Sequence, residues 1–463
     1  MSLFVAESKI YGQSQSGQYL QTELPGQWRY VTDFSQLPPD EDQWWKTFGD
    51  STLDSLIEMT VANNYNLAIA CKRIEIANNN IKIARSSYYP EVSANVGWYK
   101  ERTSGVSNKV KGRTTTESQL QLGLSASWEI DVFGRIAKKT EQSKHLLDAS
   151  RAERDAMWVS LSAKVASTYI NLRVLQAQLD VVRQHIIAQR KVVDLTEARL
   201  EAGIASMLDV TQAKIVLYST QATVPVLENS ITSTINSLAI LTGTYYQDIA
   251  PLVATAQPLP DYHKLVATGL PTELLRRRPD IVEAEANLAA AASALGIAKK
   301  DFLPTLSITG TFGTESRNVN DLFSSQAVVY TIAPTLSWTI FSGFSRSYNV
   351  ANARRNFEIE IDNYNLTVMN AVAETDNAMS DYLTSLRHID ILRNVVDQSQ
   401  QSLTLSVDLY KQGLTNFSNV SDAQVNLLEY QNSLVVAKGD ALTSLISLYE
   451  ALGGGWDNAP SSK

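Results

Sequence analysis

The 463-residue sequence contains one cysteine, four histidines and no uninterrupted apolar stretch of about 20 residues. A single cysteine, Cys71, cannot form a disulfide framework or a Cys-based zinc site within one chain, and we interpret it as a small packed side chain. Acidic residues outnumber basic ones, 48 against 40, so the sequence lacks the basic footprint of a nucleic-acid-binding protein. No membrane-spanning helix is expected, although β-strands of about ten alternating residues could still cross a bilayer.

Recognisable catalytic chemistry is also absent from the sequence. It contains no G-x-S-x-G, P-loop or H-E-x-x-H motif, and no histidine lies at metal-ligand spacing from another histidine or the cysteine. Glu283 and Glu285 are two residues apart on a predicted helix, so they face different directions and do not form an acid–base pair. We therefore expect no enzyme activity, no metal site and no cofactor, and an enzyme with an unfamiliar site is kept only as an alternative.

The sequence repeats itself at a shift of about 210 residues. The segment 199–213 aligns with 409–423 through shared Gly, Val and Ala positions, and Ser127-Trp128 aligns with Ser337-Trp338. This self-similarity predicts a duplicated helix–hairpin–helix unit. The predicted divisions are an extended N-terminal segment, a first repeat, a linker, a second repeat and a C-terminal tail, over residues 1–48, 49–245, 246–271, 272–453 and 454–463.

Two segments in each half alternate apolar and polar residues, which is the period of a β-strand. They predict one β-hairpin over residues 91–130 and another over 305–341. The polar positions of these strands are small and uncharged. Five aromatic residues at apolar positions toward the strand ends form a candidate membrane belt: Trp98, Trp128, Phe312, Tyr330 and Trp338.

Two interpretations of these hairpins are open. Their apolar faces either cover a soluble core or meet a bilayer, and the small polar positions and aromatic ends favour the bilayer. Backbone groups in lipid must all be paired, so an open four-stranded sheet cannot span a membrane. Because spanning barrels need about eight strands or more, the membrane interpretation requires several copies of the chain. Two copies would give the bare minimum with a filled interior, and more copies would open a channel.

Long helices follow each predicted hairpin. From about Arg135 to Leu200 the sequence has no proline or glycine, and apolar residues recur every three or four positions, as in a coiled coil. The pattern returns from Tyr382 to Tyr410. At 1.5 Å per residue, each helix would be roughly 100 Å long.

Each long helix is predicted to end at a glycine, Gly203 or Gly413, because glycine readily adopts the left-handed conformation that stops a helix. Second helices over about 207–241 and 418–451 complete two helical hairpins with tips near these glycines. Shorter helices are expected over about 52–86 and 272–300, the latter rich in alanine, which suits close packing. A soluble coiled-coil rod is the alternative, but a rod has no use for strands with an apolar outer face.

Several segments resemble one known family. Residues 270–288, which include Arg278-Pro279-Asp280, and their continuation to Pro304 resemble the signature of TolC-type outer-membrane factors. The resemblance is to the lipoprotein-like subgroup that serves resistance–nodulation–division efflux pumps. Residues 44–48 and 451–456 are similar to that family's ends, so the resemblance covers nearly the whole chain.

The resemblance implies a mainly helical homotrimer. Each chain would contribute four strands to a twelve-stranded outer-membrane β-barrel and its long helices to a periplasmic α-barrel. The implied location is the bacterial outer membrane, extending into the periplasm. The implied partners are outer-membrane lipid, a periplasmic adaptor protein and an inner-membrane resistance–nodulation–division pump. Members usually carry an N-terminal lipidated cysteine; this sequence has none near its start and no signal-peptide pattern there, so a lipid anchor on the native precursor is left open.

The resemblance also implies a periplasmic gate near the hairpin tips. Asp209 and Asp422 match the family's acidic positions, and Ser418 and Val425 occupy its neighbouring apolar and arginine positions, a departure that does not favour a tight salt-bridged closure. Three carboxylates around a narrow pore would attract cations and repel anions, and their proximity would raise their pKa values. The alternative for Asp209 is capping of its own helix, which is less expected of Asp422 because it lies further into its helix.

The residues at the two tips match the family's adaptor-contacting region: Gly203, Ile204, Gly413 and Leu414. As plain helix stops they would need no partner. We predict a passive, gated exit duct of a tripartite efflux pump, exporting small toxic compounds such as drugs, detergents or metal ions. The alternatives are an outer-membrane channel for type I protein secretion and a soluble coiled-coil scaffold.

Overall fold

The computed structural model describes residues 19–21, 24–30, 34, 43–104, 106, 114–261, 268, 271–273 and 277–454. These residues belong to two compact units. Unit 1 draws on Met1–Lys72, Arg151–Glu283 and Asn365–Lys463, and unit 2 on Arg73–Ser150 and Ala284–Tyr364. Each unit therefore combines segments from both halves of the chain.

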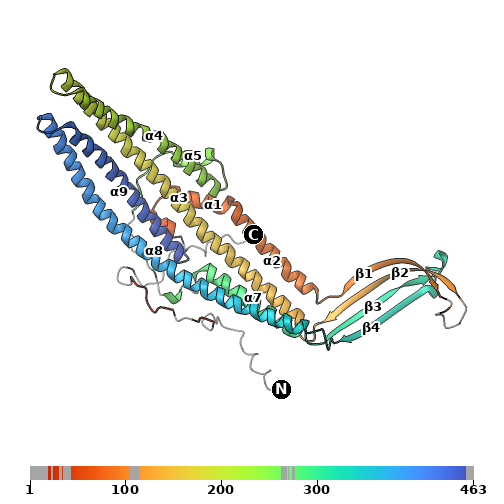
Figure 1. Ribbon diagram of the computed structural model, residues 1–463. Coiled ribbons are helices and arrows are strands. Elements are labelled where there is room, and N and C mark those ends of the chain that lie inside the picture. Colours follow the sequence, from red (N-terminus) through yellow and green to blue (C-terminus); the bar gives the residue numbers. More distant parts are fainter. Residues whose placement is uncertain are drawn as a thin grey trace. The chain divides into compact units, whose positions relative to one another are not determined.

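Unit 2 contains one four-stranded antiparallel sheet (Figure 1). Its strands are β1 (Glu91–Thr103), β2 (Thr115–Ile130), β3 (Thr305–Ser316) and β4 (Val328–Ser337), in the order β1-β2-β3-β4. The pairing of β2 with β3 joins the two hairpins. Within the described part of the chain, β1 and β4 each pair on one side only, so the sheet has two open edges.

The strand register gathers the apolar residues on one face of the sheet. Val96 lies opposite Leu122, Leu124 opposite Phe312, and Phe312 opposite Tyr330, so the same parity continues across all four strands. The other face carries mostly small or polar residues, with the apolar Val329 in the row of Asn95, and Asn95 donates to Ser125 Oγ across it at 2.8 Å. No described residue covers this apolar face, since Val96, Phe312 and Tyr330 are each more than 60% exposed.

Two pairs of helices have matching lengths in the two halves. α3 (Arg135–Glu201) and α8 (Ser345–Lys411) have 67 residues each, and α4 (Met207–Leu241) and α9 (Phe417–Ala451) have 35 each. Most of the predicted apolar seam is buried, including Trp158, Val165 and Leu172 in α3 and Ile389 in α8. The long helices predicted from spacing are therefore present.

The shorter elements differ from the prediction. The helix expected over 52–86 is two helices, α1 (Ser51–Asn63) and α2 (Tyr65–Ser86). They are separated at Asn64, whose Oδ1 accepts from the backbone N–H groups of Asn66 and Leu67 and whose Nδ2 donates to Leu241 O at 2.7 Å. This side chain satisfies the first turn of α2 and thereby interrupts the preceding helix.

Other boundaries are also corrected. The helix expected over 272–300 is α7 (Pro279–Lys300), which begins at a proline, the residue type favoured at a first helical position. The linker predicted over 246–271 contains a short helix, α5 (Tyr246–Val253). The described part of the chain also contains four 3₁₀ turns: η2 (Trp44–Phe48), η3 (Pro271–Glu273), η4 (Val319–Asp321) and η5 (Ser325–Ala327).

One helix of the described residues, α7, is long and apolar enough to pass a length-and-composition test for crossing a membrane. This finding corrects the expectation that no such helix exists. Packed helices rich in alanine pass the same test, and α7 carries Glu283 and Glu285 within its sequence, so the property alone is weak evidence of a membrane span.

The core of unit 1 includes an aromatic cluster around η2. The ring of Trp44 stacks on that of Tyr449 with centroids 5.3 Å apart, and Trp45 meets Trp158 edge-on at 6.0 Å. All four rings are buried. Because Trp158 lies on α3 and Tyr449 on α9, the η2 turn is packed against helices from both halves of the chain.

Candidate functional site

The two hairpin tips have the same backbone geometry. Gly203 and Gly413 have φ values of 72° and 74°, in the left-handed region that glycine tolerates. The following residues close each turn, since Ile204 N donates to Arg199 O at 3.0 Å and Leu414 N donates to Leu409 O at 2.9 Å. The side chains of Ile204 and Leu414 are exposed, so each tip presents an apolar residue to its surroundings.

Asp209 stabilises the N-terminus of its own helix. Ser206 is the N-cap of α4, and its hydroxyl accepts from Asp209 N, while the Asp209 carboxylate accepts from Ser206 N in a capping box. The alternative interpretation of Asp209 as a capping residue is therefore realised. This carboxylate is held in place by its own chain.

The same carboxylate also contacts the other hairpin. Tyr410 OH of α8 donates to Asp209 Oδ2 at 3.1 Å, and the Arg199 guanidinium lies 4.9 Å from the centre of the Tyr410 ring. Arg199 additionally donates to Lys411 O at 2.8 Å. Burial and the hydrogen bond to Asp209 raise the pKa of Tyr410, so the phenol is a proton donor at neutral pH. The polar cluster Arg199–Tyr410–Asp209 thus connects the two hairpins beside their tips.

An apolar cluster packs the hairpins together at the same level. Tyr410 and Phe417 meet edge-to-face with ring centroids 5.3 Å apart. The buried members come from all four hairpin helices: Val193, Ala213, Leu217, Tyr410, Phe417 and Val420. Tyr410 belongs to both clusters, so its ring is fixed by packing while its hydroxyl is fixed by Asp209.

The remaining proposed gate residues lie on one face of α9. Ser418, Asp422 and Val425 follow at spacings of four and three residues, so they share a helix face, and all three are exposed. Among the described residues, the Asp422 carboxylate has no hydrogen-bond or ion-pair partner. Asp209 and Asp422 are therefore in different states, the first bonded within its own chain and the second exposed.

Sequence reasoning missed two residues of this region, Arg199 and Tyr410. Tyr410 was noted only as a seam position of α8, and Arg199 only as part of the repeated segment. Tyr410 reaches this region through its hydrogen bond to Asp209, and the two residues are 201 positions apart in the sequence. No local signal in the sequence reports such a contact.

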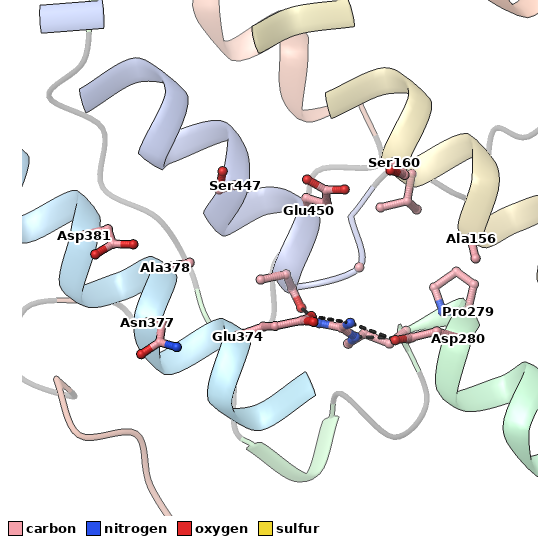
Figure 2. A pocket seen from close by; sticks show the side chains of 14 residues that line it. Ala156, Ser160, Pro279, Asp280, Glu374, Asn377, Ala378, Asp381, Ser447 and Glu450 are labelled. Atoms are coloured by element: carbon pink, nitrogen blue, oxygen red, sulfur yellow. Dashed lines mark hydrogen bonds and ion pairs between the residues drawn. The ribbon is translucent and has the colours of Figure 1, made fainter. Parts of the chain in front are cut away.

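The segment that resembles the family signature borders a cavity of about 540 Å³ in unit 1 (Figure 2). Arg278 donates to Asp280 Oδ2 and Glu374 Oε2, each at 2.7 Å, and to Ala451 O at 3.0 Å. Arg278 therefore joins the start of α7 to α8 and satisfies a carbonyl at the C-terminal end of α9. The signature arginine has a clear structural role.

The charged side chains that line this cavity in the described part of the chain are four acidic residues and Arg278. Figure 2 shows Asp280, Glu374, Asp381 and Glu450 around it. Burial raises the pKa of Glu450, and the nearby Glu374 charge adds to this, against the opposing effects of Ser160, Arg278 and Lys164. Within the described residues, no group of three or more His, Cys, Asp or Glu side chains has a geometry that could hold a metal ion.

Four residues of the predicted aromatic belt lie on the apolar face of the sheet, and the fifth, Trp338, directly follows β4 at the next position that would face the same side. Trp128 Nε1 donates to Tyr88 O at 2.9 Å and Trp338 Nε1 donates to Phe302 O at 3.0 Å, so the two indoles anchor the turns that lead into β1 and β3. Trp98 lies opposite Leu120, eight residues along β2 from Trp128. The register puts Phe312 in the row of Leu124, between the rows of these two tryptophans, and Tyr330 beside Phe312.

Comparison with known proteins decides the family. The sequence model of a family described as "Outer membrane efflux protein" matches residues 56–244 and 270–454. The chain belongs to the outer membrane efflux protein family. It is therefore an outer-membrane efflux channel protein that extends into the periplasm, as its relatives are.

Individual relatives agree with this assignment. The chain is 29% identical to the probable efflux pump outer membrane protein TtgC of Pseudomonas putida, over 92% of this chain and 87% of TtgC. It is 30% identical to the pyoverdine export outer membrane protein OpmQ of Pseudomonas putida, over 93% and 92%.

Among solved structures, this efflux channel protein is similar to the outer-membrane channel OprN. The TM-score is 0.86 at 28% identity, covering 94% of this chain and 98% of OprN. It also matches CusC with a TM-score of 0.82 at 25% identity, covering 93% and 97%. The predicted TolC-like channel fold and outer-membrane efflux function are confirmed.

Proposed function

We propose that three copies of this chain assemble into a passive, gated exit duct of a tripartite efflux pump. The observation that carries the proposal is the four-stranded sheet, which has an exposed apolar face and two open edges. Such a sheet is incomplete in lipid, because every backbone N–H and C=O must be paired there. Completion requires strands from other copies.

Three copies supply twelve strands, enough for a closed barrel with β1 of one copy beside β4 of the next. The apolar face meets lipid and the small polar face, with Asn95 and Ser125, lines the interior. Below the membrane, the coiled-coil helices of three copies form a hollow α-barrel. Trp98, Trp128 and Trp338 contact the membrane interfaces, where amphipathic rings are favoured. Phe312 and Tyr330 lie between the rows of Trp98 and Trp128, so they face lipid between the two interfaces instead of joining the predicted belt.

The proposed barrel follows from a duplicated chain. Residues 49–245 and 272–453 are the two repeats, with 1–48 as an N-terminal segment, 246–271 as a linker and 454–463 as a tail. The equal lengths of α3 and α8, and of α4 and α9, support this division. The two separate ranges matched by the family model support it as well.

The gate lies at the periplasmic end, beside the hairpin tips. Asp422, with Ser418 and Val425, faces the pore, and its exposed and unpaired carboxylate supports this role. Asp209 contributes through its bond to Tyr410, which holds the two hairpins of one copy together. A ring of three Asp422 carboxylates favours passage of cations over anions.

The exposed tips contact a periplasmic adaptor. Ile204 and Leu414, each following a glycine turn, offer the apolar contacts, and the adaptor links the duct to an inner-membrane resistance–nodulation–division pump. Relatives are named for efflux of toluene and antibiotics and for export of pyoverdine, so the cargo is small toxic or amphipathic molecules. The duct performs no chemistry, and the energised partner drives transport.

The particle mass in detergent tests the assembly. Purified chain in a neutral detergent is expected to contain three copies per particle when its mass is measured by light scattering with the detergent contribution subtracted. A monomer would overturn the proposed duct.

Single-channel conductance tests the gate. Asp422→Ala is expected to raise conductance in planar bilayers, because it shortens the side chains and removes the charges at the narrowest ring. Asp390→Ala, which removes an exposed α8 carboxylate paired with Arg393, is the control and should leave conductance unchanged. Equal conductance of Asp422→Ala and the unmodified protein would exclude Asp422 from the constriction.

A further inference from the structure

A second cavity, of about 450 Å³, lies in unit 1 and is lined by the described residues 20, 24, 25 and 27–29 and by helix α8. Its floor is a stripe of α8 that runs from Asn365 through Val368, Met369 and Val372 to Asp376. These positions follow the i, i+3, i+4, i+7, i+11 spacing of one helix face, so the stripe is about 16 Å long at 1.5 Å per residue. The cavity is elongated along the helix.

The roof of the cavity is formed by described residues of the N-terminal segment, among them Leu20, Leu24, Pro25 and Trp28. At one end, residues 19 and 21 are bonded to Asn365 of α8, whose Oδ1 accepts from Gln21 N at 2.9 Å and whose Nδ2 donates to Tyr19 O at 3.0 Å.

The other end of the roof is fixed by Tyr30 OH, which donates to Ser380 Oγ at 3.1 Å. The segment is therefore bonded to α8 on both sides of the cavity. Most of the lining is apolar.

Charge distinguishes one end of this apolar space. Asp376 closes the floor, and among the described residues its carboxylate has no hydrogen-bond or ion-pair partner. Among the described lining residues the cation is Arg29, which is exposed, and its guanidinium lies 5.7 Å from the centre of the Tyr30 ring. Asp376 therefore places a carboxylate with no ion-pair partner among the described residues beside an apolar surface, an arrangement that attracts a cation with an apolar body.

We propose that this cavity binds an elongated amphiphilic organic cation. The apolar body lies along Val368, Met369 and Val372 under the N-terminal segment, and the cationic group sits beside Asp376. A volume of a few hundred Å³ suits a drug-sized molecule. The proposal is independent of the duct function, because the site needs only the N-terminal segment and α8 of one chain.

Binding should also hold the N-terminal segment on α8. A ligand that binds the folded chain raises its apparent stability in proportion to the logarithm of its concentration above Kd. We expect an amphiphilic cation to raise the melting temperature of the protein and to slow proteolysis of the N-terminal segment. A matched anion should have neither effect.

The test uses the full chain purified in a neutral maltoside detergent, with rhodamine 6G as the cationic probe and fluorescein as the anionic probe of similar ring frame. Fluorescence polarisation is expected to report saturable binding of rhodamine 6G only. Asp376→Asn, which keeps the side-chain shape, should weaken binding roughly two- to fivefold, the loss expected for one partly exposed ion pair. Met369→Trp should abolish it by filling the cavity.

Asp381→Asn is the matched control. Asp381 lies on the same helix but lines the Arg278 cavity, so its loss should leave the affinity for rhodamine 6G unchanged. Each variant is compared at equal elution volume and melting temperature, so that a folding defect is separated from a binding defect.

Three results would overturn the proposal. They are unchanged affinity in Asp376→Asn, equal affinity for fluorescein, and a loss in Asp381→Asn as large as that in Asp376→Asn. Absence of rhodamine 6G binding to the unmodified assembly would also overturn it, because the cavity would then be covered by a second copy. None of these results bears on the particle mass or the conductance, so failure here is distinguishable from failure of the proposed duct.

Discussion

The two hairpin tips share one backbone turn but are stabilised differently. Both long helices end at a glycine in the left-handed region, and both return helices have 35 residues. The return helix α4 begins with the Ser206–Asp209 capping box. The return helix α9 has Asn416 at its N-cap, without a side-chain capping hydrogen bond, and its first residue, Phe417, is only 2% exposed.

The first turn of α4 is stabilised by polar interactions, and the first turn of α9 by apolar packing. On α4, hydrogen bonds to Asp209 order the first turn, and the same carboxylate accepts from Tyr410. On α9, burial of Phe417 against Tyr410 orders the first turn, and no acidic residue is used. Two apparently similar acidic positions near the tips therefore differ, since Asp209 has a structural task and Asp422 does not.

Removing the ring of Phe417 should cause the largest loss of stability at the two tips. Phe417→Ala is expected to destabilise the chain by about 3–5 kcal/mol, because it leaves a cavity at the cluster shared by both hairpins. The measurement is the midpoint of denaturant unfolding followed by circular dichroism. Leu414→Ala, three residues away and exposed, is the control with an expected change near zero. Equal stability of the two variants would contradict the assigned role of Phe417.

Altering the shared turn should affect both tips equally. Gly203→Ala and Gly413→Ala each force an L-residue into the left-handed region, at an expected cost of about 1–2 kcal/mol. No atom lies within 4 Å of a Cβ built at either glycine, so steric clashes add nothing to the backbone cost. The same unfolding measurement should give two changes of similar size. A large difference between them would mean that the two turns are not equivalent.

The smallest expected effect distinguishes the two helix starts. Ser206→Ala should cost about 1 kcal/mol, the usual loss for a capping serine. Asn416→Ala should cost much less, because the Asn416 side chain makes no capping hydrogen bond. Both variants are compared by unfolding midpoint and by amide hydrogen exchange in the first turn of the return helix. The assigned difference between the two helix starts is contradicted if Asn416→Ala speeds amide exchange in the first turn of α9 as much as Ser206→Ala does in α4.

Periodic features of the fold were predictable from the sequence. The three-and-four spacing and the absence of proline and glycine predicted α3, and the glycines predicted both tips, because these signals act over a few neighbouring residues. Alternation predicted the strands for the same reason. The break at Asn64 was missed, since the side chain of Asn64 bonds to Leu241, 177 residues away.

The site was predictable only in part, for the same physical reason. Family resemblance pointed to Asp209 and Asp422, but not to the contact of Asp209 with Tyr410. The role of Arg278 was equally hidden, because its partners Glu374 and Ala451 lie 96 and 173 residues away. Hydrogen bonds between distant segments leave no periodic trace in a sequence, so they emerge only from the folded chain.

The open edges of the β1–β4 sheet have a consequence for how the protein is made. In the described part of an isolated chain, β1 and β4 each expose one unpaired edge beside an uncovered apolar face, the features that promote aggregation through edge-to-edge pairing. A newly synthesised copy is therefore safest when a chaperone shields this sheet until it reaches the lipid. Yield during refolding should fall steeply as protein concentration rises in the absence of detergent, because misdirected strand pairing then competes with correct assembly.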